Sequence, residues 1–424
     1  MAMRTEVRTL TNGMRVLLAP CEAESVALGL FVASGSRHED ANAAGISHFI
    51  EHMLFKGTPT RTPLDITQAI EGRGGNFNAC TSEESTCYYA HLPDDYLPEA
   101  VDILSDMYLR ATIPADEFAR EKQVVVEEIK MYADEPDSVA AENLQRNLFP
   151  KSTLGSPVAG SAATLGPLTP AVMRRYIRAH YLPSRTVAVV VGSFDPDMAF
   201  GLVSRAFARL RDRPWPAVVD CPSRGRVVAG QTVARDIQQA QLALGYRTFG
   251  VKDSRKYAAT VMDAILGRGM MSRLFQEVRE KRGLSYDISS RMQFFSDAGI
   301  FAVTAGLDAA KGAKALATVD RELSRICTRR VGAAELARMK EFLVGNFRLA
   351  HERVTSKLFF YGSTLQAFGR LVSPQEQIEG IRAVTAADVQ NVACAILRPE
   401  NRSVSWVVPN DRRTREKALE RTVT

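Results

Sequence analysis

The sequence has 424 residues, of which 46% are hydrophobic and 24% are charged, and its formal net charge is +6. This length predicts two or more domains rather than one, and this composition is typical of a folded protein with a sizeable core. No short segment concentrates the lysines and arginines, so we expect a slightly cationic solvated surface and no nucleic-acid interface. An acidic or phosphorylated partner stays compatible with this charge.

Location is predicted from the N-terminus, the apolar runs and the cysteines. The N-terminus has no apolar segment followed by a small-residue cleavage site, so no secretory signal is expected. No run approaches the roughly 18 apolar residues that span a bilayer. None of the cysteines forms a CxxC motif, which favours free thiols in a reducing compartment. We therefore expect a cytoplasmic protein that does not enter a membrane. The cysteines are Cys21, Cys80, Cys87, Cys221, Cys327 and Cys394.

Short apolar runs alternate with longer amphipathic stretches along the chain. Several of the predicted strands follow each other through short turns, which favours antiparallel pairing. The pattern therefore predicts an α+β fold with mostly antiparallel sheets flanked by helices. In chain order, the clearest elements are a strand at 28–32, helices at 97–109 and 117–132, and strands at 187–191, 241–246 and 300–304.

Two short matches relate the first half of the chain to the second. Residues 26–30 recur in similar form as residues 242–246, and residues 117–120 recur as residues 335–338. The two offsets are nearly equal, which favours two homologous halves of similar size.

A segment rich in proline, glycine and arginine separates these halves. We therefore predict an N-terminal αβ domain at 1–215, a linker at 216–228, and a homologous C-terminal αβ domain at 229–424.

A helix with two histidines four residues apart is predicted at residues 45–57. His48 and His52 lie one turn apart on one face, so both imidazoles can reach a single Zn²⁺. Glu51 borders the same face without ligating, which suits a base that takes a proton from the attacking water. Two structural histidines on a surface helix are the alternative. It is disfavoured because the whole chain has only 6 histidines.

A catalytic zinc needs a third protein ligand and an open position. The predicted helix at 116–132 offers Glu121, Glu127 and Glu128. Glu121 and Glu128 share a face, whereas Glu127 is rotated by about 100° from Glu128. One of the pair could ligate the metal while the other accepts the second N–H of a ligand histidine. A solvated acidic face is the alternative, and the three valines at 124–126 favour a buried face instead.

The spacing of His48, Glu51, His52 and Glu128 resembles the inverted zinc motif of the pitrilysin/insulinase peptidase family. The similarity extends over nearly the whole chain and is closest to half-sized members, such as the mitochondrial processing peptidase β subunit and its bacterial relatives. It includes the segments 11–16, 74–79 and 121–128.

This resemblance implies a function and a set of roles. Glu128 would be the third ligand of one zinc per chain, and Glu121 would support a ligand histidine. The implied function is a zinc metalloendopeptidase that hydrolyses peptides or unfolded segments inside a clamshell chamber, with Glu51 as the base. Two related αβ halves are also implied, which agrees with the repeat.

The repeat predicts that the second half holds no metal. By the offset of the first match, residues 48–52 correspond to about 264–268. By the offset of the second, Met339 and Asn346 stand where the first half has Glu121 and Glu128. The second half therefore keeps the scaffold and lacks the candidate ligands.

Residues 76–89 alternate and are rich in residues that favour strands. The resemblance implies an edge strand here that pairs with the substrate backbone, which suits a peptidase of broad specificity. An ordinary core strand is the alternative. The substrate-binding residues would be Asn76, Phe77, Asn78 and Ala79, with the last two beside the scissile bond.

Residues 279–286 are similar to a family segment that bears an arginine and a tyrosine seven residues apart. The resemblance assigns these roles to Arg279 and Tyr286, which would contact the substrate carbonyl from across a chamber and stabilise the oxyanion. Arg268 stands nearby where family members commonly have glycine. A core tyrosine and a surface arginine are the alternative.

The resemblance also bears on assembly. Half-sized members build one chamber from two chains, so we expect a homodimer, with a heterodimer of related subunits as the alternative. Two rival functions stay open. One is a non-catalytic core subunit of a larger complex, although such chains generally lose part of the motif. The other is a dedicated peptidase that removes leader or targeting sequences.

Overall fold

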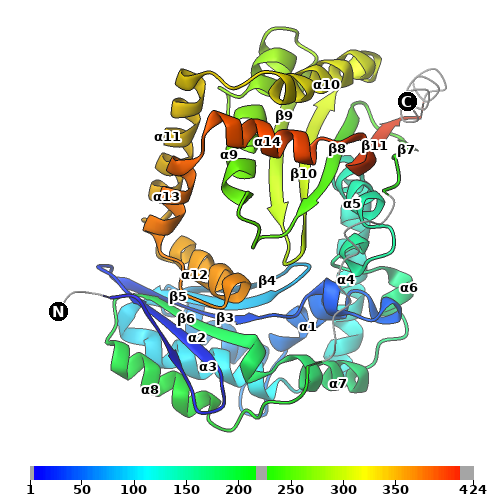
Figure 1. The fold of residues 1–424 in the computed structure, drawn as a ribbon. Helices are drawn as coiled ribbons and strands as arrows, with labels where there is room; N and C mark the ends of the chain where they lie inside the picture. The colour runs from blue at the N-terminus through cyan, green and yellow to red at the C-terminus, as the bar shows by residue number, and fades with distance from the viewer. Residues whose placement is uncertain (1–3, 216–226, 411–424) are drawn as a thin grey trace. The chain divides into compact units, whose positions relative to one another are not determined.

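The structure is a computed structural model that describes residues 4–215 and 227–410 (Figure 1). Contacts within the chain divide it into two compact units, each built on one sheet. Unit 1 comprises Met1–Ile129, Pro157–Val219 and Arg348–Val372. Unit 2 comprises Lys130–Ser156, Asp220–Phe347 and Ser373–Thr424.

Unit 1 contains a six-stranded sheet in the order β1-β2-β6-β3-β5-β4. Strands β2 and β6 pair in parallel, and every other neighbouring pair is antiparallel. Strand β4 lies at one edge of the sheet. The strands are β1 (Glu6–Thr9), β2 (Arg15–Pro20), β3 (Ser25–Val32), β4 (Asn76–Thr81), β5 (Thr86–Pro93) and β6 (Thr186–Gly192).

Helices cover both faces of this sheet. Helices α1, α3 and α8 contribute to a large apolar core on one face, and α12 packs against β3 and β6 on the other through Leu358, Tyr361 and Leu365 (Figure 1). The helices are α1 (Ile46–Leu54), α2 (Pro63–Glu71), α3 (Leu97–Arg110), α4 (Ala115–Asp134), α6 (Ala162–Leu165), α7 (Pro170–His180), α8 (Pro196–Phe207) and α12 (Val354–Phe368).

Unit 2 has a five-stranded sheet in the order β7-β11-β8-β10-β9, in which only β7 and β11 pair in parallel. Its strands are β7 (Gly230–Arg235), β8 (Ala240–Phe249), β9 (Ser285–Phe294), β10 (Ala298–Leu307) and β11 (Arg402–Pro409).

The two faces of this second sheet are also covered by helices. Helices α9, α10 and α14 contribute to the core on one face, and α5 packs on the other through Leu144 and Leu148. The helices are α5 (Pro136–Leu148), α9 (Lys256–Gly267), α10 (Gly312–Thr328), α11 (Ala333–Ala350), α13 (Pro374–Ala383) and α14 (Ala386–Ile396).

The predicted α+β fold with two mostly antiparallel sheets is confirmed. The four predicted strands lie within β3, β6, β8 and β10, and the two predicted helices within α3 and α4. The prediction of a single strand over residues 76–89 is wrong. It forms the hairpin of β4 and β5, because residues 82–85 make a turn in which the Ser82 amide donates to the Ser85 carbonyl.

The two units are not continuous in sequence, unlike the halves predicted at 1–215 and 229–424. Helix α5 precedes the predicted boundary and belongs to unit 2, while α12 follows it and belongs to unit 1. The physical reason is that each sheet has two apolar faces to cover, and each unit takes the helix for its second face from the other half of the chain. Of the predicted linker, residues 216–226 lie outside the described residues.

The sequence repeat falls at equivalent places in the two units. Residues 26–30 lie in β3 and residues 242–246 in β8, and both are interior strands with two neighbours. The matched glycines of these segments, Gly29 and Gly245, both face the helix that comes from the other half. A Cβ atom at Gly29 would lie 3.2 Å from a methyl of Leu358, and one at Gly245 would lie 2.8 Å from a methyl of Leu144.

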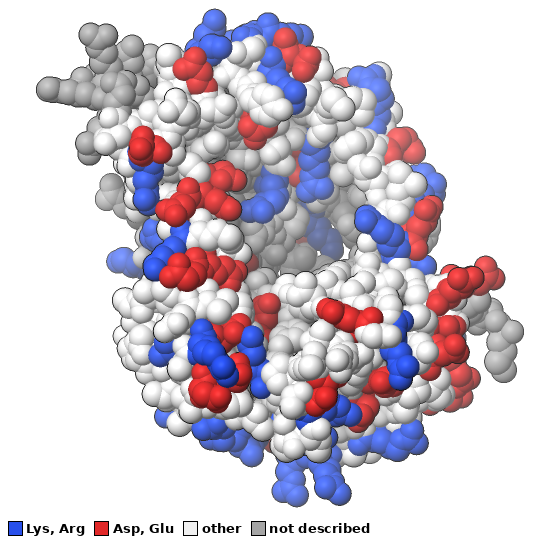
Figure 2. Space-filling model, turned by 180° about the vertical axis from the view of Figure 1, so that it is seen from behind, with Lys and Arg blue, Asp and Glu red and all other residues white. Residues whose placement is uncertain are grey.

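The charged surface and the cysteines of the described residues agree with the expectations from the sequence. Lys and Arg side chains are interspersed with Asp and Glu over much of the face shown in Figure 2. All five cysteines within the described ranges are free, and Cys221 lies outside them. Within those ranges, no helix combines the length and the apolar character required to traverse a bilayer.

Candidate metal centre

Helix α1 is fixed by its apolar face. Because residues three and four positions apart share one side of a helix, burial of that side leaves His48, Glu51 and His52 on the other, where they are half-buried. The side chains packed into the core are Ile46, Phe49, Ile50, Met53 and Leu54.

A buried glutamate holds the N-terminus of α1. Glu39 is 6% exposed, and its carboxylate accepts hydrogen bonds of 2.7 Å from the backbone amides of Gly45 and Ser47. The first amides of a helix lack partners and carry partial positive charge, so a carboxylate stabilises them. Burial raises the pKa of Glu39 to about 7, although the two amides oppose this shift.

Glu39 was not predicted from the sequence as part of the site. It lies six residues before Gly45, the N-cap of α1, whereas recognisable capping patterns place the capping side chain at the helix terminus itself. The only available signal was an isolated glutamate upstream of a glycine that begins a predicted helix.

His48, His52 and Glu128 lie together in unit 1. Each offers one ligand atom, and these atoms all lie within 4.8 Å of one another. Glu128 Oε1 is 3.8 Å from His48 Nε2, and Glu128 Oε2 is 3.4 Å from His52 Nε2. Two imidazoles and one carboxylate that leave a position open are a donor set used by catalytic zinc.

Glu121 supports His52 from the side away from Glu128. Its Oε1 lies 2.9 Å from His52 Nδ1, and its Oε2 lies 2.6 Å from Lys56 Nζ. A carboxylate at Nδ1 favours the tautomer that leaves Nε2 free for a metal. Burial alone would lower the pKa of His52, but the hydrogen bond and charge of Glu121 raise it, as do the charges of Glu128 and Glu51.

The surroundings of His48 differ from those of His52. Among the described residues, its Nδ1 is buried and has no hydrogen-bond partner. Burial lowers the pKa of His48, and the neighbouring His52 lowers it further, although the charge of Glu128 opposes both. A neutral imidazole at His48 is the form that ligates a metal.

The three candidate glutamates of α4 lie on different sides of the helix. Glu121 and Glu128 both contact the histidines of α1, whereas Glu127 is exposed. The seven-residue spacing places the first two on one side of α4. Burial of Phe118, Glu121 and Val125 fixes that side against the rest of unit 1.

Glu51 lies between α1 and the edge of the sheet. The hydroxyl of Thr81, the last residue of β4, donates a hydrogen bond to Glu51 Oε2. Burial raises the pKa of Glu51, while the hydrogen bond from Thr81 and the charge of His52 oppose this. Thr81 was not predicted as a site residue, although it directly follows the predicted substrate-binding residues.

The predicted substrate-binding residues all lie on edge strand β4. Asn76 and Asn78 are exposed, while Phe77 and Ala79 are half-buried against the core that contains α1. The backbone amide of Ala79 donates a hydrogen bond of 2.8 Å to the side-chain oxygen of Asn78. An edge strand presents backbone groups that can pair with a further strand.

Arg279 and Tyr286 lie side by side in unit 2. Arg279 belongs to a short π-helix, Phe275–Glu280, and Tyr286 is the second residue of β9. The guanidinium carbon lies 5.4 Å from the centre of the Tyr286 ring and 4.7 Å from that of Phe275. Tyr286 is 76% exposed, so its hydroxyl is available to a ligand.

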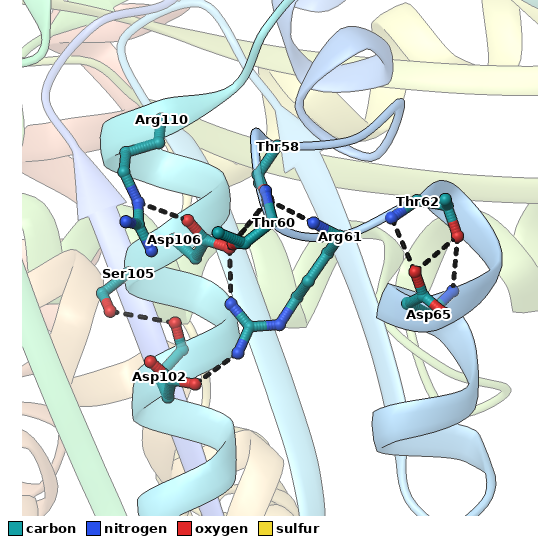
Figure 3. A network of polar contacts seen from close by, with 9 residues as sticks. All are labelled: Thr58, Thr60, Arg61, Thr62, Asp65, Asp102, Ser105, Asp106 and Arg110. Carbon is teal, nitrogen blue, oxygen red and sulfur yellow. Dashed lines mark hydrogen bonds and ion pairs between the residues drawn. The ribbon is translucent and has the colours of Figure 1, made fainter.

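The loop after α1 is anchored to α3 by the carboxylate of Asp106, which is 2% exposed (Figure 3). Asp106 accepts hydrogen bonds from the hydroxyls of Thr58 and Thr60 and from the guanidinium groups of Arg61 and Arg110. Burial alone would raise the pKa of Asp106, but its hydrogen bonds with Thr58, Arg61 and Arg110 hold it below its ordinary value. The network fixes the end of the chain segment that carries the histidines.

Comparison with known families and proteins gives a consistent result. Residues 15–162 match the family model described as Insulinase (Peptidase family M16), and residues 167–343 match the one described as Peptidase M16 inactive domain. A Mycobacterium tuberculosis protein named an uncharacterized zinc protease is 36% identical over 393 residues, which are 92% of this chain and 90% of that protein.

A Bacillus subtilis protein, also named an uncharacterized zinc protease, is 33% identical over 386 residues, 91% of this chain and 94% of the relative. The crystal structure of a protease from Helicobacter pylori superimposes with a TM-score of 0.89 at 21% identity, covering 96% of this chain and 99% of that one. At that identity the likeness bears on the fold alone.

Proposed function

The chain belongs to the insulinase family of zinc metallopeptidases, and on this premise we propose that it is an endopeptidase acting at His48, His52 and Glu128. The observation that carries the proposal is the convergence of these three ligand atoms within 4.8 Å, beside the carboxylate of Glu51. Peptides or unfolded protein segments are the substrates it would hydrolyse.

The residues present fit one zinc per chain. His48, His52 and Glu128 would hold it, and Glu121 keeps His52 Nε2 available by occupying Nδ1. When bound, zinc supplies a Lewis acid that polarises a carbonyl and lowers the pKa of water. A chain that served only as a core subunit would have no need for this intact donor set.

Glu51 would be the general base and later the general acid. Its carboxylate takes the proton of the attacking water and passes it to the leaving amine. The hydrogen bond from Thr81 holds Oε2, which leaves Oε1 for the proton. Burial favours this role because it raises the proton affinity of the carboxylate.

Substrate binding would follow from the position of β4. An extended peptide that added to this edge would use main-chain hydrogen bonds, with Asn76, Phe77, Asn78 and Ala79 as its neighbours. Arg279 and Tyr286 would donate hydrogen bonds to the developing oxyanion, a role that suits a guanidinium and a phenol. A cytoplasmic homodimer completes the proposal, and sedimentation of the purified chain measures the dimer directly.

Replacement of the base tests the proposal. Glu51→Gln should keep its zinc and its fold while hydrolysis of a fluorogenic peptide falls by at least ~10²-fold, the usual scale for a general base. Glu127→Gln, on the exposed side of α4, is the matched control and should hydrolyse normally. Near-native turnover by Glu51→Gln would remove Glu51 from the mechanism.

A digest of unstructured proteins and peptide libraries tests the substrate class. Cleavage at many sites with weak side-chain preference is the expected result. Cleavage confined to one N-terminal leader-like segment would instead favour the dedicated processing peptidase.

A further inference from the structure

Unit 1 contains a cavity of about 800 Å³ that none of the proposed catalytic or substrate-binding residues lines. It is lined by residues of α3, α7 and α8 and of the segments that follow α7 and α8, and these three helices cover the same face of the sheet (Figure 1). Its volume lies in the range of about 300–1,000 Å³ that is typical of small-molecule sites.

Six arginines line this cavity, and two carboxylates, Asp102 and Asp106, accompany them. Both carboxylates already pair with Arg61, and Asp106 also pairs with Arg110, one of the six (Figure 3). In the part of the chain that the structure describes, the other five form no ion pair. They are Arg178, Arg205, Arg209, Arg211 and Arg213.

The six arginines are exposed and give the rim of this cavity a local surplus of positive charge. Arg205 lies in the last turn of α8, and Arg209 lies two residues beyond the end of that helix. Three further arginines, Arg178, Arg211 and Arg213, line the same cavity. A ligand with several negative charges in a small volume would pair with several of these arginines at once, whereas isolated carboxylates spaced along a peptide would pair with fewer.

The cavity also has an apolar part between the arginines. Val101, Ile177, Leu202, Ala206 and Leu210 line it, and all of these except the buried Val101 are partly exposed. A purely inorganic anion would leave this surface uncovered, whereas an apolar or aromatic moiety attached to the anion would cover it.

We infer that this cavity binds a small molecule of the nucleoside diphosphate or triphosphate class, with the phosphates on the arginines and the base on the apolar side chains. Guanidinium groups match phosphate oxygens with paired hydrogen bonds, so several arginines around one cavity suit a polyphosphate. The site is independent of the proposed peptidase activity, and its test needs no measurement of hydrolysis.

Isothermal titration calorimetry of the full chain tests the inference with ADP, ATP and adenosine as probes. We expect both nucleotides to bind with an affinity that falls as salt rises, and adenosine to bind about tenfold more weakly or not at all. Arg205→Ala/Arg209→Ala should weaken ATP binding about tenfold or more. The ATP affinity of Arg205→Lys/Arg209→Lys should lie between those of the wild type and the alanine variant, because lysine keeps the charge and loses the paired hydrogen bonds.

Arg329→Ala/Arg330→Ala is the matched control. These two arginines are exposed and lie in unit 2, outside the residues that line the cavity, so their loss lowers the net charge equally and should leave ATP binding unchanged. Equal weakening by both double variants would overturn the inference, since it would reduce the effect to overall charge. Unchanged binding by Arg205→Ala/Arg209→Ala would overturn it as well.

A second arm separates the soluble nucleotide from a phospholipid headgroup. Sedimentation with phosphatidylglycerol vesicles should leave the chain in the supernatant. Co-sedimentation with vesicles in a chain that does not bind ATP would overturn the inference and assign the arginines to a membrane surface.

Discussion

Units 1 and 2 use the same layered plan, and they differ at the few positions where chemistry is possible. In both, an interior strand carries a glycine against a helix supplied by the other half of the chain. Glu121 and Glu128 of α4 face the histidines of α1, whereas the corresponding residues of α11 are Met339 and Asn346. Met339 is 2% exposed and packs in the core of unit 2.

This difference shows that the layered scaffold does not depend on the residues of the candidate metal site. An apolar side chain at Met339 contributes to packing, and a carboxylate at the equivalent Glu121 contributes to a polar network at some cost of burial. The layers of helices and sheet are retained in both cases. The fold therefore positions a site without requiring one.

Removal of Glu128, the proposed third ligand, should have the largest effect and would make unit 1 resemble unit 2. Glu128→Gln should lose most of its zinc and nearly all hydrolysis, because a neutral amide is a far weaker ligand than a carboxylate. Elemental analysis of the purified variant measures the metal. Glu127→Gln is the control, and loss of zinc in that variant with retention in Glu128→Gln would reverse our assignment of the faces of α4.

Tyr286→Phe asks whether unit 2, whose described residues include no candidate metal cluster, serves the reaction. If the phenol stabilises the oxyanion, turnover should fall by about 10²-fold while the zinc content stays unchanged. Steady-state kinetics on a peptide gives the ratio of the variant's turnover to that of the wild type. Tyr96→Phe in unit 1 is the control, because it removes a phenol hydroxyl far from β9 in sequence. Full turnover by Tyr286→Phe would leave Tyr286 as an exposed residue with no catalytic part.

The strands and the ligand helix could be predicted because their signals are local. Runs of apolar residues predict β3, β6, β8 and β10, and the four-residue spacing of the histidines predicts one face of α1. The seven-residue spacing of Glu121 and Glu128 also predicts that both lie on one side of α4. Which of the two lies nearer both histidines depends on how α4 packs against α1, and no local pattern contains that information.

The exchange of helices could not be predicted for a related reason. An amphipathic pattern shows that α5 and α12 each bury one side, but it does not show which sheet they cover. Their place depends on contacts between residues far apart in the chain, such as that between Gly29 and Leu358 or between Gly245 and Leu144.

Alanine at the matched glycines tests whether both units need this close approach. Gly245→Ala and Gly29→Ala should each lower the free energy of unfolding by about 1–3 kcal/mol, the usual cost of overpacking a core. The two costs should be similar, because a Cβ at Gly29 would also lie 2.9 Å from Cε2 of Phe31, close to the 2.8 Å between a Cβ at Gly245 and Leu144. Urea unfolding measures both.

Gly201→Ala on α8 is the control for the two glycine variants. Its Cβ would meet nothing within 4 Å, and alanine favours a helix over glycine, so the change should be neutral or slightly stabilising. Unchanged stability in both strand variants would show that α5 and α12 can shift to accommodate a methyl group.

Glu39→Gln should have the smallest effect, and it tests a feature of α1 that the sequence did not reveal. At pH 7 the folded carboxyl is close to its pKa of about 7, so about half of the molecules already carry a neutral group there. Glutamine is also neutral, and its oxygen can still accept from one of the two amides at the helix terminus. We expect the free energy of unfolding at pH 7 to change by less than about 1 kcal/mol.

The pH dependence should change more clearly than the stability itself. A carboxyl whose pKa is raised by folding binds a proton more tightly in the folded state, so its contribution to stability is full below the unfolded pKa of 4.5 and is lost as the pH rises through about 7. Wild-type protein should therefore lose this contribution between those values, and Glu39→Gln should not. The difference between the two profiles excludes the contribution of the histidines, which titrate over part of the same pH range. Glu341→Gln, at a side chain 69% exposed, is the control. If the Glu39→Gln and wild-type profiles are parallel, Glu39 stays ionised throughout and holds α1 as a fixed charge.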